Sequence, residues 1–121
     1  AEHVPLVAHT GAVIACAPSP DSRWLATGSR DHTVALWDVR RRSLVRRWRL
    51  SATAAAVAFL DPSTLLPGTM GGDLEAWDRD SGRRLWRIGG FSGGIEGLRL
   101  SPDRKTLAVA SGANGHPVSL S

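Results

Sequence analysis

Apolar residues in this chain gather in short runs, and clusters of Gly, Pro, Asp and Ser separate the runs. The runs follow one order, which is strand, Pro-containing turn, strand, Gly or Asp turn, and strand, and this order occurs three times along the chain. No stretch keeps the 3.6-residue period of an amphipathic helix, and Gly or Pro interrupts the chain about every ten residues. The pattern therefore predicts an all-β fold.

Each of the three units has its own set of predicted strands. The strands span residues 13–17, 24–28 and 33–37 in the first unit, 56–60, 65–69 and 74–77 in the second, and 95–100, 106–111 and 118–120 in the third. Basic stretches at 43–50 and 83–88 predict a fourth, outermost strand after the first and second units. In the third unit, the turn before the last strand is expected to be about two residues longer than its counterparts.

One dipeptide ends the third strand in two of the units, because Trp37-Asp38 recurs forty positions later as Trp77-Asp78. A fixed period of about 40 residues indicates a repeat architecture. The motifs are densest in residues 9–38, which also hold His9 and the turn Ser19-Pro20-Asp21. These motifs resemble the WD40 repeat, and the resemblance covers essentially the whole chain. It implies about three β-propeller blades of four antiparallel strands each.

The resemblance also divides the chain into blades. Residues 1–8 are expected to be the outer strand of a preceding blade, 9–50 the first blade, 51–89 the second, and 90–121 a third blade without its outer strand. Propellers typically close with 4 to 8 blades, so this is a partial propeller. The remaining blades belong either to a longer chain or to other copies of this chain that assemble head to tail into an oligomeric ring. We favour the longer chain, because the second and third units depart from the pattern of the first.

The resemblance implies a hydrogen-bonded set inside the first blade, formed by His9, Thr27, Asp31 and Trp37. The chemistry suits burial, because an indole N–H only donates, a hydroxyl donates and accepts, and a histidine can connect to a carboxylate. The same residue types could indicate a catalytic relay or a metal site, but here we expect them to hold one blade together. The later units replace these residues, so their blades are expected to depend on packing alone. The replacements are Pro67 and Gly71 in the second unit, and Phe91, Val109 and Ser121 in the third.

Members of the family usually bind partners on the face of the propeller where the first strands begin. Carried over by position, that face has eight candidate residues, which are mostly small and apolar. They are Ala12, Ile14, Arg30, Ala56, Ala58, Met70, Gly94 and Glu96. Such a surface suits a peptide or a loop that lies flat, with Arg30 and Glu96 as its charged selectors.

The chain is basic, with a formal net charge of +4. Six arginines form a basic stripe around the predicted outer strand of the first blade. They are Arg40, Arg41, Arg42, Arg46, Arg47 and Arg49. One interpretation is a surface for nucleic acid or an acidic partner. The other, which we favour, is an outer strand whose charges discourage edge-to-edge pairing.

The single cysteine and the tryptophans are interpreted structurally. Cys16 cannot form an internal disulfide, and its apolar neighbours predict a buried structural thiol. Trp24 and the two tryptophans of the repeated dipeptide are expected in the core. Trp48 and Trp86 lie on outer strands, where we expect partial burial, with a role as partner anchors as the alternative.

These observations predict a scaffold or recognition module for a protein or peptide partner, with binding of nucleic acid as the alternative. No acid, base and nucleophile converge outside the set in the first blade, so we expect no enzymatic activity, no cofactor and no metal site. No apolar run approaches the roughly 20 residues needed to cross a bilayer, so no membrane partner is expected. The expected location is the cytoplasm.

Overall fold

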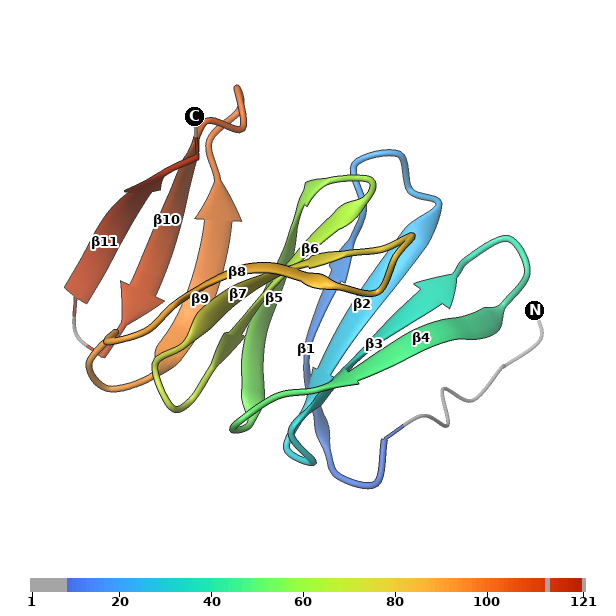
Figure 1. The fold of residues 1–121 in the computed structure, drawn as a ribbon, viewed down its shortest axis with the longest axis horizontal. Coiled ribbons are helices and arrows are strands. Elements are labelled where there is room, and N and C mark those ends of the chain that lie inside the picture. Colours follow the sequence, from blue (N-terminus) through green and yellow to red (C-terminus); the bar gives the residue numbers. More distant parts are fainter. Residues whose placement is uncertain (1–8, 113, 121) are drawn as a thin grey trace.

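The computed structural model of the protein describes residues 9–112 and 114–120. Within these ranges, strands β1 to β11 form three separate antiparallel sheets, and no residue is helical. The sheets lie side by side as a fan (Figure 1). The expected all-β fold, made of propeller blades, is therefore confirmed. Residues 1–8, expected to be an outer strand, lie outside the described part of the chain.

The strands follow the sequence from the inner to the outer edge of each sheet. The first blade contains β1 (Val13–Pro18), β2 (Trp24–Ser29), β3 (Thr33–Asp38) and β4 (Ser43–Arg49). The second contains β5 (Ala54–Asp61), β6 (Thr64–Thr69), β7 (Leu74–Asp78) and β8 (Arg84–Ile88). The third contains β9 (Ile95–Leu100), β10 (Thr106–Ser111) and β11 (Asn114–Ser119). The inner strands are therefore β1, β5 and β9.

The turn between β10 and β11 differs from its prediction. Ser111 pairs with Asn114, so this turn is short, and the expected longer turn at 112–117 is wrong. Pro117 signals a turn in the sequence, yet it lies within β11. Since β11 is the last strand of its sheet among the described residues, a proline without a backbone N–H is tolerated there.

The shorter turn also changes the register of the third blade. Val118 lies opposite Leu107, as Trp37 lies opposite Leu25 in the first blade. The position of the tryptophan is therefore taken by Val118. Ser121, expected at that position, lies outside the described residues.

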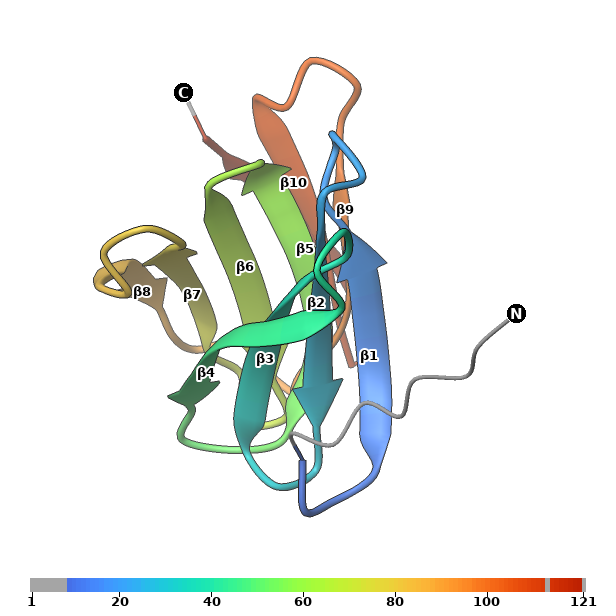
Figure 2. The same ribbon diagram turned by 90° about the vertical axis from the view of Figure 1, so that its right-hand side faces the viewer.

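The blades bury their sheet faces against one another. Each inner strand packs on the next, β1 on β5 and β5 on β9, and the second strands β2 and β6 contact the inner strand of the following blade. The view turned by 90° shows this arrangement from the side of the first blade (Figure 2). One core includes Ala26, Leu36, Val57, Phe59 and Leu65, and the other includes Leu66, Leu74, Ile95, Leu107 and Val109. The second blade is thus covered on both faces, and all of β6 is buried.

Two glycines allow adjacent blades to approach closely. A Cβ at Gly28 would lie 2.6 Å from the backbone oxygen of Ala54, and one at Gly68 would lie 2.6 Å from Cγ2 of Ile95. Ala54 and Ile95 are the first residues of β5 and β9, and both are fully buried. The first residue of each following inner strand therefore fits into a slot over a glycine of the preceding blade.

The Ser-Pro-Asp turns join the first two strands of the first and third blades in the same way. Ser19 Oγ donates to the carboxylate of Asp21 and accepts the amide of Trp24 at 2.9 Å. Ser101 and Asp103 repeat the first of these bonds at 2.6 Å. Short polar side chains thus satisfy backbone groups in both turns, which is why the sequence marks them clearly.

The glycine slot between the first two blades leads to a stability prediction. We expect Gly28→Ala to lower the free energy of unfolding by about 1 to 3 kcal/mol, because the new methyl group must displace the backbone of Ala54. Gly115→Ala is the matched control, since nothing lies within 4 Å of a Cβ at that position. Urea denaturation followed by tryptophan fluorescence measures both. Equal effects of the two substitutions would contradict the slot.

Candidate functional site

The structure brings the four predicted residues of the first blade together. The side chain of His9 is 1% exposed and lies between two threonines. Its Nδ1 lies 2.8 Å from Thr33 Oγ1, and its Nε2 lies 2.8 Å from Thr27 Oγ1. Trp37 Nε1 donates to Thr27 Oγ1 at 3.0 Å, and Asp31 Oδ2 lies 3.5 Å from His9 Nδ1. Thr33, which sequence reasoning missed, is the fifth member of this network.

The hydrogen bonds of the network all run from donor to acceptor in one direction, toward Asp31. The Thr33 hydroxyl donates to the Asp31 carboxylate, so the Thr33 oxygen accepts the Nδ1–H of His9. In the neutral imidazole, Nε2 then accepts the hydroxyl proton of Thr27, whose oxygen accepts the indole N–H of Trp37. Every proton therefore points along one path from Trp37 to the charged end at Asp31. Such a chain of donors polarises each bond in the same sense and strengthens it.

Asp31 is the charged end because its surroundings favour the carboxylate. Burial alone would raise the pKa of Asp31, but hydrogen bonds from the Thr33 hydroxyl, the amides of Thr10 and Thr33, and Ser29 outweigh it. Together they hold the pKa well below its usual range. The Thr33 amide bond to Asp31 Oδ1, at 2.9 Å, closes a turn over two residues. A hydroxyl residue two positions after an aspartate was thus the available sequence signal for Thr33.

The expectation that the second blade depends on packing alone is wrong at Trp77. Its Nε1 donates to Glu75 Oε1 at 3.0 Å. The Glu75 side chain is 4% exposed, and Arg84 lies 4.0 Å from it. Pro67 offers no side-chain acceptor at the position of Thr27, so an acid on the strand of the tryptophan provides one.

One arginine of the basic stripe forms hydrogen bonds to the backbone of the second blade. Arg46 Nε donates to the carbonyl oxygen of Arg79 at 2.9 Å, and its NH2 group donates to that of Asp80 at 2.7 Å. Trp48 Nε1 donates to the carbonyl oxygen of Gly82 at 3.2 Å. Trp48 is also buried in the core between the blades, so it is not an exposed partner anchor. Arg46 and Trp48 thus fix the turn between β7 and β8 from the neighbouring blade.

The other five arginines of the stripe are exposed. They are Arg40, Arg41, Arg42, Arg47 and Arg49. Arg47 and Arg49 line a cleft of about 380 Å³ whose walls also include Asp31. The carboxylate reduces the positive potential of that cleft.

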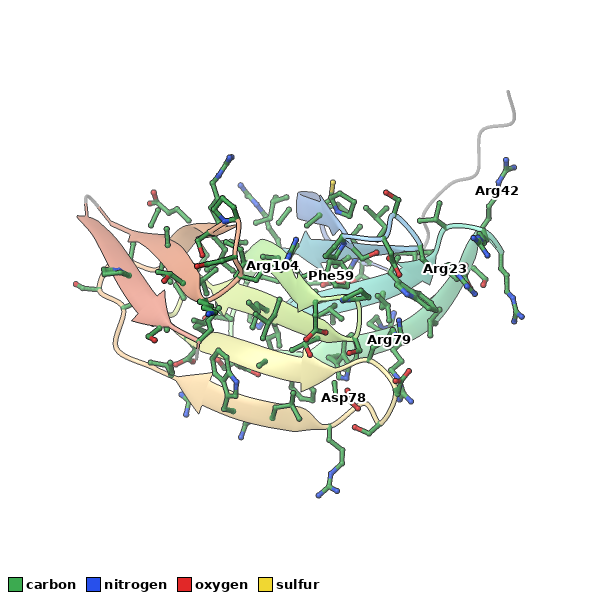
Figure 3. The ribbon with its side chains drawn as sticks, turned by 90° about the horizontal axis from the view of Figure 1, so that it is seen from above. Arg23, Arg42, Phe59, Asp78, Arg79 and Arg104 are labelled. Carbon is green, nitrogen blue, oxygen red and sulfur yellow. The ribbon has the colours of Figure 1, made fainter. Side chains whose placement is uncertain are left out.

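Two more arginines connect neighbouring blades near the Ser-Pro-Asp turns. The guanidinium of Arg79 lies 4.4 Å from the centroid of the Trp24 ring in the first blade. Arg104, in the third blade, donates to the carbonyl oxygen of Phe59 at 2.8 Å, and Figure 3 shows the two side by side. Sequence reasoning missed both contacts, because no motif marks a residue that acts across a blade boundary.

The predicted partner face lies at the ends of the three sheets opposite the Ser-Pro-Asp turns (Figure 1). The backbone gives its equivalences. The Arg30 amide donates to the Ala12 oxygen at 3.0 Å, and the Met70 amide donates to the Thr53 oxygen at 2.9 Å. Thr53 is therefore the counterpart of Ala12 in the second blade, and the next strand position, Ala55, is the counterpart of Ile14.

This register corrects two of the candidates for the partner face. Ala56 and Ala58 are 6% and 9% exposed and lie in the core between the second and third blades. They do not reach the surface. The strand β5 begins at Ala54, earlier than predicted. Ala56 and Ala58 were chosen because they flank Val57, which was taken as the leading position, so both candidates lie too far along the strand.

Five of the six remaining candidates are exposed, and Ala12 is one of them. Ile14 is 40% exposed and Met70 is 55% exposed, and Arg30 and Glu96 are also exposed. Gly94 is buried, and a Cβ there would lie 2.5 Å from the Met70 oxygen. The exposed candidates thus come from all three blades, and Gly94 is the point where the third blade approaches the backbone of the second.

Cys16 is exposed, so the prediction of a buried thiol is wrong. Cys16 lies on the inner strand of the first blade, on the face opposite Ala15 and Ala17, which pack against the core shared with the second blade. The described residues contain no group of three or more His, Cys, Asp or Glu side chains that could hold a metal ion. They also include no helix that could span a membrane.

The family model for the WD domain, G-beta repeat, matches residues 3–38. Autophagy-related protein 16 of Arabidopsis thaliana is 27% identical over 115 residues, which are 93% of this chain and 23% of that protein. Target of rapamycin complex subunit LST8 of Mus musculus is 29% identical over 97 residues, which are 77% of this chain and 29% of that protein. The chain therefore spans less than a third of either relative.

A solved structure shares the fold. The crystal structure of the Cps50 (Swd1) β-propeller domain from Myceliophteria thermophila matches with a TM-score of 0.80 at 22% sequence identity. The match covers 93% of this chain and 35% of that chain. The three sheets are thus arranged as consecutive blades of a β-propeller.

The low pKa of Asp31 predicts how stability depends on pH. A carboxyl group with a lowered pKa in the folded state stabilises the fold above its unfolded pKa of about 4, and the contribution is lost as the pH falls below that value. We expect Asp31→Asn to remove this contribution. The free energy of unfolding should then fall less steeply between pH 4 and pH 2 in the variant than in the unchanged chain. Asp80→Asn, at a 72% exposed side chain, is the control. Parallel pH profiles of all three chains would contradict the role of Asp31.

Arg46 provides a prediction that separates structure from surface charge. Arg46→Ala should lower the free energy of unfolding by about 1 to 2 kcal/mol, because it leaves two carbonyl groups of the second blade without their donor. Arg40→Ala removes the same charge from an exposed position and should leave stability unchanged. Thermal unfolding of both variants tests this, and equal melting temperatures would refute the contact.

Proposed function

The chain belongs to the WD40-repeat family, and from that premise we propose that it presents a surface that binds a protein or peptide partner. The proposed role is that of a scaffold or recognition module without catalysis or a cofactor. Such a role agrees with what the network in the first blade does, since its protons all point along one buried path to Asp31. We infer that those side chains stabilise the blade.

The observation that carries the proposal is the set of exposed side chains at the ends of the sheets opposite the Ser-Pro-Asp turns, which we call the patch. Met70, on the second blade, is an exposed, flexible apolar side chain, with Ile14 on the first blade and Glu96 on the third. Apolar side chains with a few charged neighbours are typical of protein-binding surfaces, and methionine adapts to partners of different shape. Arg30 provides a second charged contact on the first blade.

The relatives support a protein partner. One similar protein is, by its name, a subunit of the target of rapamycin complex, and the chain resembles 29% of its length. Because this share is small, the partner of that protein is not transferred to this chain. What supports the proposal is that a similar protein is a subunit of a complex.

Nucleic acid is the less favoured partner. Binding to a phosphate backbone depends on lysines and arginines that neutralise the phosphates. Here Arg46 is used to hold the second blade, and Asp31 lies in the cleft beside Arg47 and Arg49. No observation on the described residues favours a phosphate ligand over a protein.

We extend the proposal to a cytoplasmic location. Cys16 is a free, exposed thiol, and a reducing compartment keeps such a thiol in that form.

A display selection tests the proposed surface. Peptides from a random library are selected on the 121-residue chain, and their dissociation constants are measured by calorimetry with the unchanged chain and its variants. We expect Met70→Ala to weaken binding about tenfold, because it removes an apolar contact of the patch. Ile14→Ala should act in the same direction.

Leu85→Ala is the matched control, because Leu85 is 54% exposed but lies on β8, away from the patch. Binding that Leu85→Ala abolishes while Met70→Ala leaves it unchanged would place the partner surface elsewhere. Binding of a random-sequence duplex DNA that disappears with added salt would favour the basic stripe instead.

A further inference from the structure

Glu96 differs from the other acidic residues in the described part of the chain, because its carboxylate has no partner there. Each of the others accepts a hydrogen bond from a turn, an arginine or an indole. Asp61 and Asp78 hold turns, for example, and Asp73 accepts a bond from Arg87 at 3.0 Å. Glu96 accepts no such bond from a described residue, and it is exposed. The fold therefore gives this carboxylate no structural contact.

Arg30 provides the opposite charge on the patch. Its guanidinium forms no hydrogen bond or ion pair with a described residue, and it is exposed. Arg46 and Arg104, in contrast, donate to backbone carbonyl groups of a neighbouring blade. Some other exposed arginines also lack such contacts, but Arg30 is the arginine that lies in the patch. The patch thus carries one unpaired charge of each sign.

A β-bulge places the side chain of Glu96. The pairing of the inner strand shifts by one residue after Val13 in the first blade, after Ala54 in the second and after Ile95 in the third. The extra residue follows each of these positions, and in the third blade it is Glu96. Because a bulge leaves its extra residue out of the ladder and changes the direction of its side chain, Glu96 lies at a position where the sheet does not use it.

The second blade shows that the positions of both charges stay accessible between neighbouring blades. The counterpart of Glu96 is Ala55, and the counterpart of Arg30 is Met70. Although the second blade is covered on both faces, Met70 is 55% exposed and Ala55 is partly exposed. The exposure of Arg30 and Glu96 is therefore a property of their positions at the ends of the sheets. It does not require a bare sheet face.

The two charges lie on either side of an apolar residue. Arg30 belongs to the first blade, Met70 to the second and Glu96 to the third. Gly94, two residues before Glu96, lies against the second blade, since a Cβ there would be 2.5 Å from the Met70 oxygen. The patch therefore runs from a positive end, across an apolar side chain, to a negative end.

We propose that the partner segment lies across the three blades with an acidic side chain at Arg30, an apolar side chain at Met70 and a basic group at Glu96. This inference rests on the proposed function, because it assigns a chemistry to the partner of the patch. A partner that covers Glu96 without supplying a cation would remove water from an unpaired carboxylate, which weakens binding. A partner in the reverse orientation would bring like charges together. The two charges thus select the partner and its orientation, while Met70 contributes apolar contact.

Charge reversal on both sides of the contact tests this order. The probes are peptides selected on the unchanged chain whose binding Met70→Ala weakens. We expect Glu96→Lys to weaken their binding at least about tenfold at low ionic strength. Replacing one basic residue of the peptide by glutamate should restore most of the binding to the Glu96→Lys chain. Arg30→Glu should weaken binding in the same way, and a lysine in place of one acidic residue of the peptide should restore it. Calorimetry measures all of these dissociation constants.

Two substitutions on the turn between β7 and β8 are matched controls. Asp80→Lys makes the same charge change as Glu96→Lys, and Arg83→Glu makes the same change as Arg30→Glu. Both control positions are exposed, and this turn is at the end of its sheet opposite the patch. We expect both controls to bind the peptides within about twofold of the unchanged chain. Thermal unfolding verifies that the variants are folded, and Glu96→Lys should keep the melting temperature, since the carboxylate has no contact in the described chain to lose.

The outcomes separate this inference from the proposed function. Rescue at both positions, by two different residues of the peptide, supports the charge order. Binding that depends on Met70 but is unchanged by Glu96→Lys and Arg30→Glu would overturn the charge order and leave the proposed function standing. Losses that no charge reversal in the peptide restores, or equal losses in the Asp80→Lys and Arg83→Glu controls, would overturn it as well. Peptide binding that Met70→Ala leaves unchanged would contradict the proposed surface itself, and the charge order with it.

Discussion

The packing of one sheet face on the next is the interaction on which the rest of this structure depends. A single four-stranded sheet of this size has two faces and cannot bury either by itself. The second blade solves this by lying between its neighbours, so that all of β6 is buried. In the first blade β1 has exposed positions on one face, and in the third blade β10 has the same.

Close backbone contacts and polar contacts fix the distance and the register between blades, which apolar packing alone does not. Slots over Gly28 and Gly68 set how closely the inner strands approach, and Arg46 and Arg104 tie the turns of one blade to the backbone of another. The network from Trp37 to Asp31 works within a blade and joins its second and third strands to the segment at His9. Specific hydrogen bonds therefore define the register, while burial provides most of the stability.

The repeated strands and motifs could be predicted from the amino-acid sequence, and contacts between blades could not. Strand order, blade number and the four residues around His9 could be inferred, because turn residues and the Trp-Asp dipeptide signal them locally. Arg104 could not, because its role depends on which strand of the neighbouring blade lies opposite it. Thr33 and Glu75 each bond to a residue two positions away, and these local contacts were missed. The exposure of Cys16 could not be inferred either, since burial of an apolar residue requires a neighbouring surface that composition alone does not describe.

Hydrogen exchange of the backbone amides, at a concentration where the chain is monomeric, tests the dependence on stacking most directly. Exchange rates report the free energy of local opening, which rises with the burial of both sheet faces. The account predicts that amides of β6 exchange most slowly, and that those of β1 and β10 exchange faster, since each has exposed positions on one face. Slower exchange in β1 or β10 than in β6 would contradict the claim that stacking between blades is what holds this fold together.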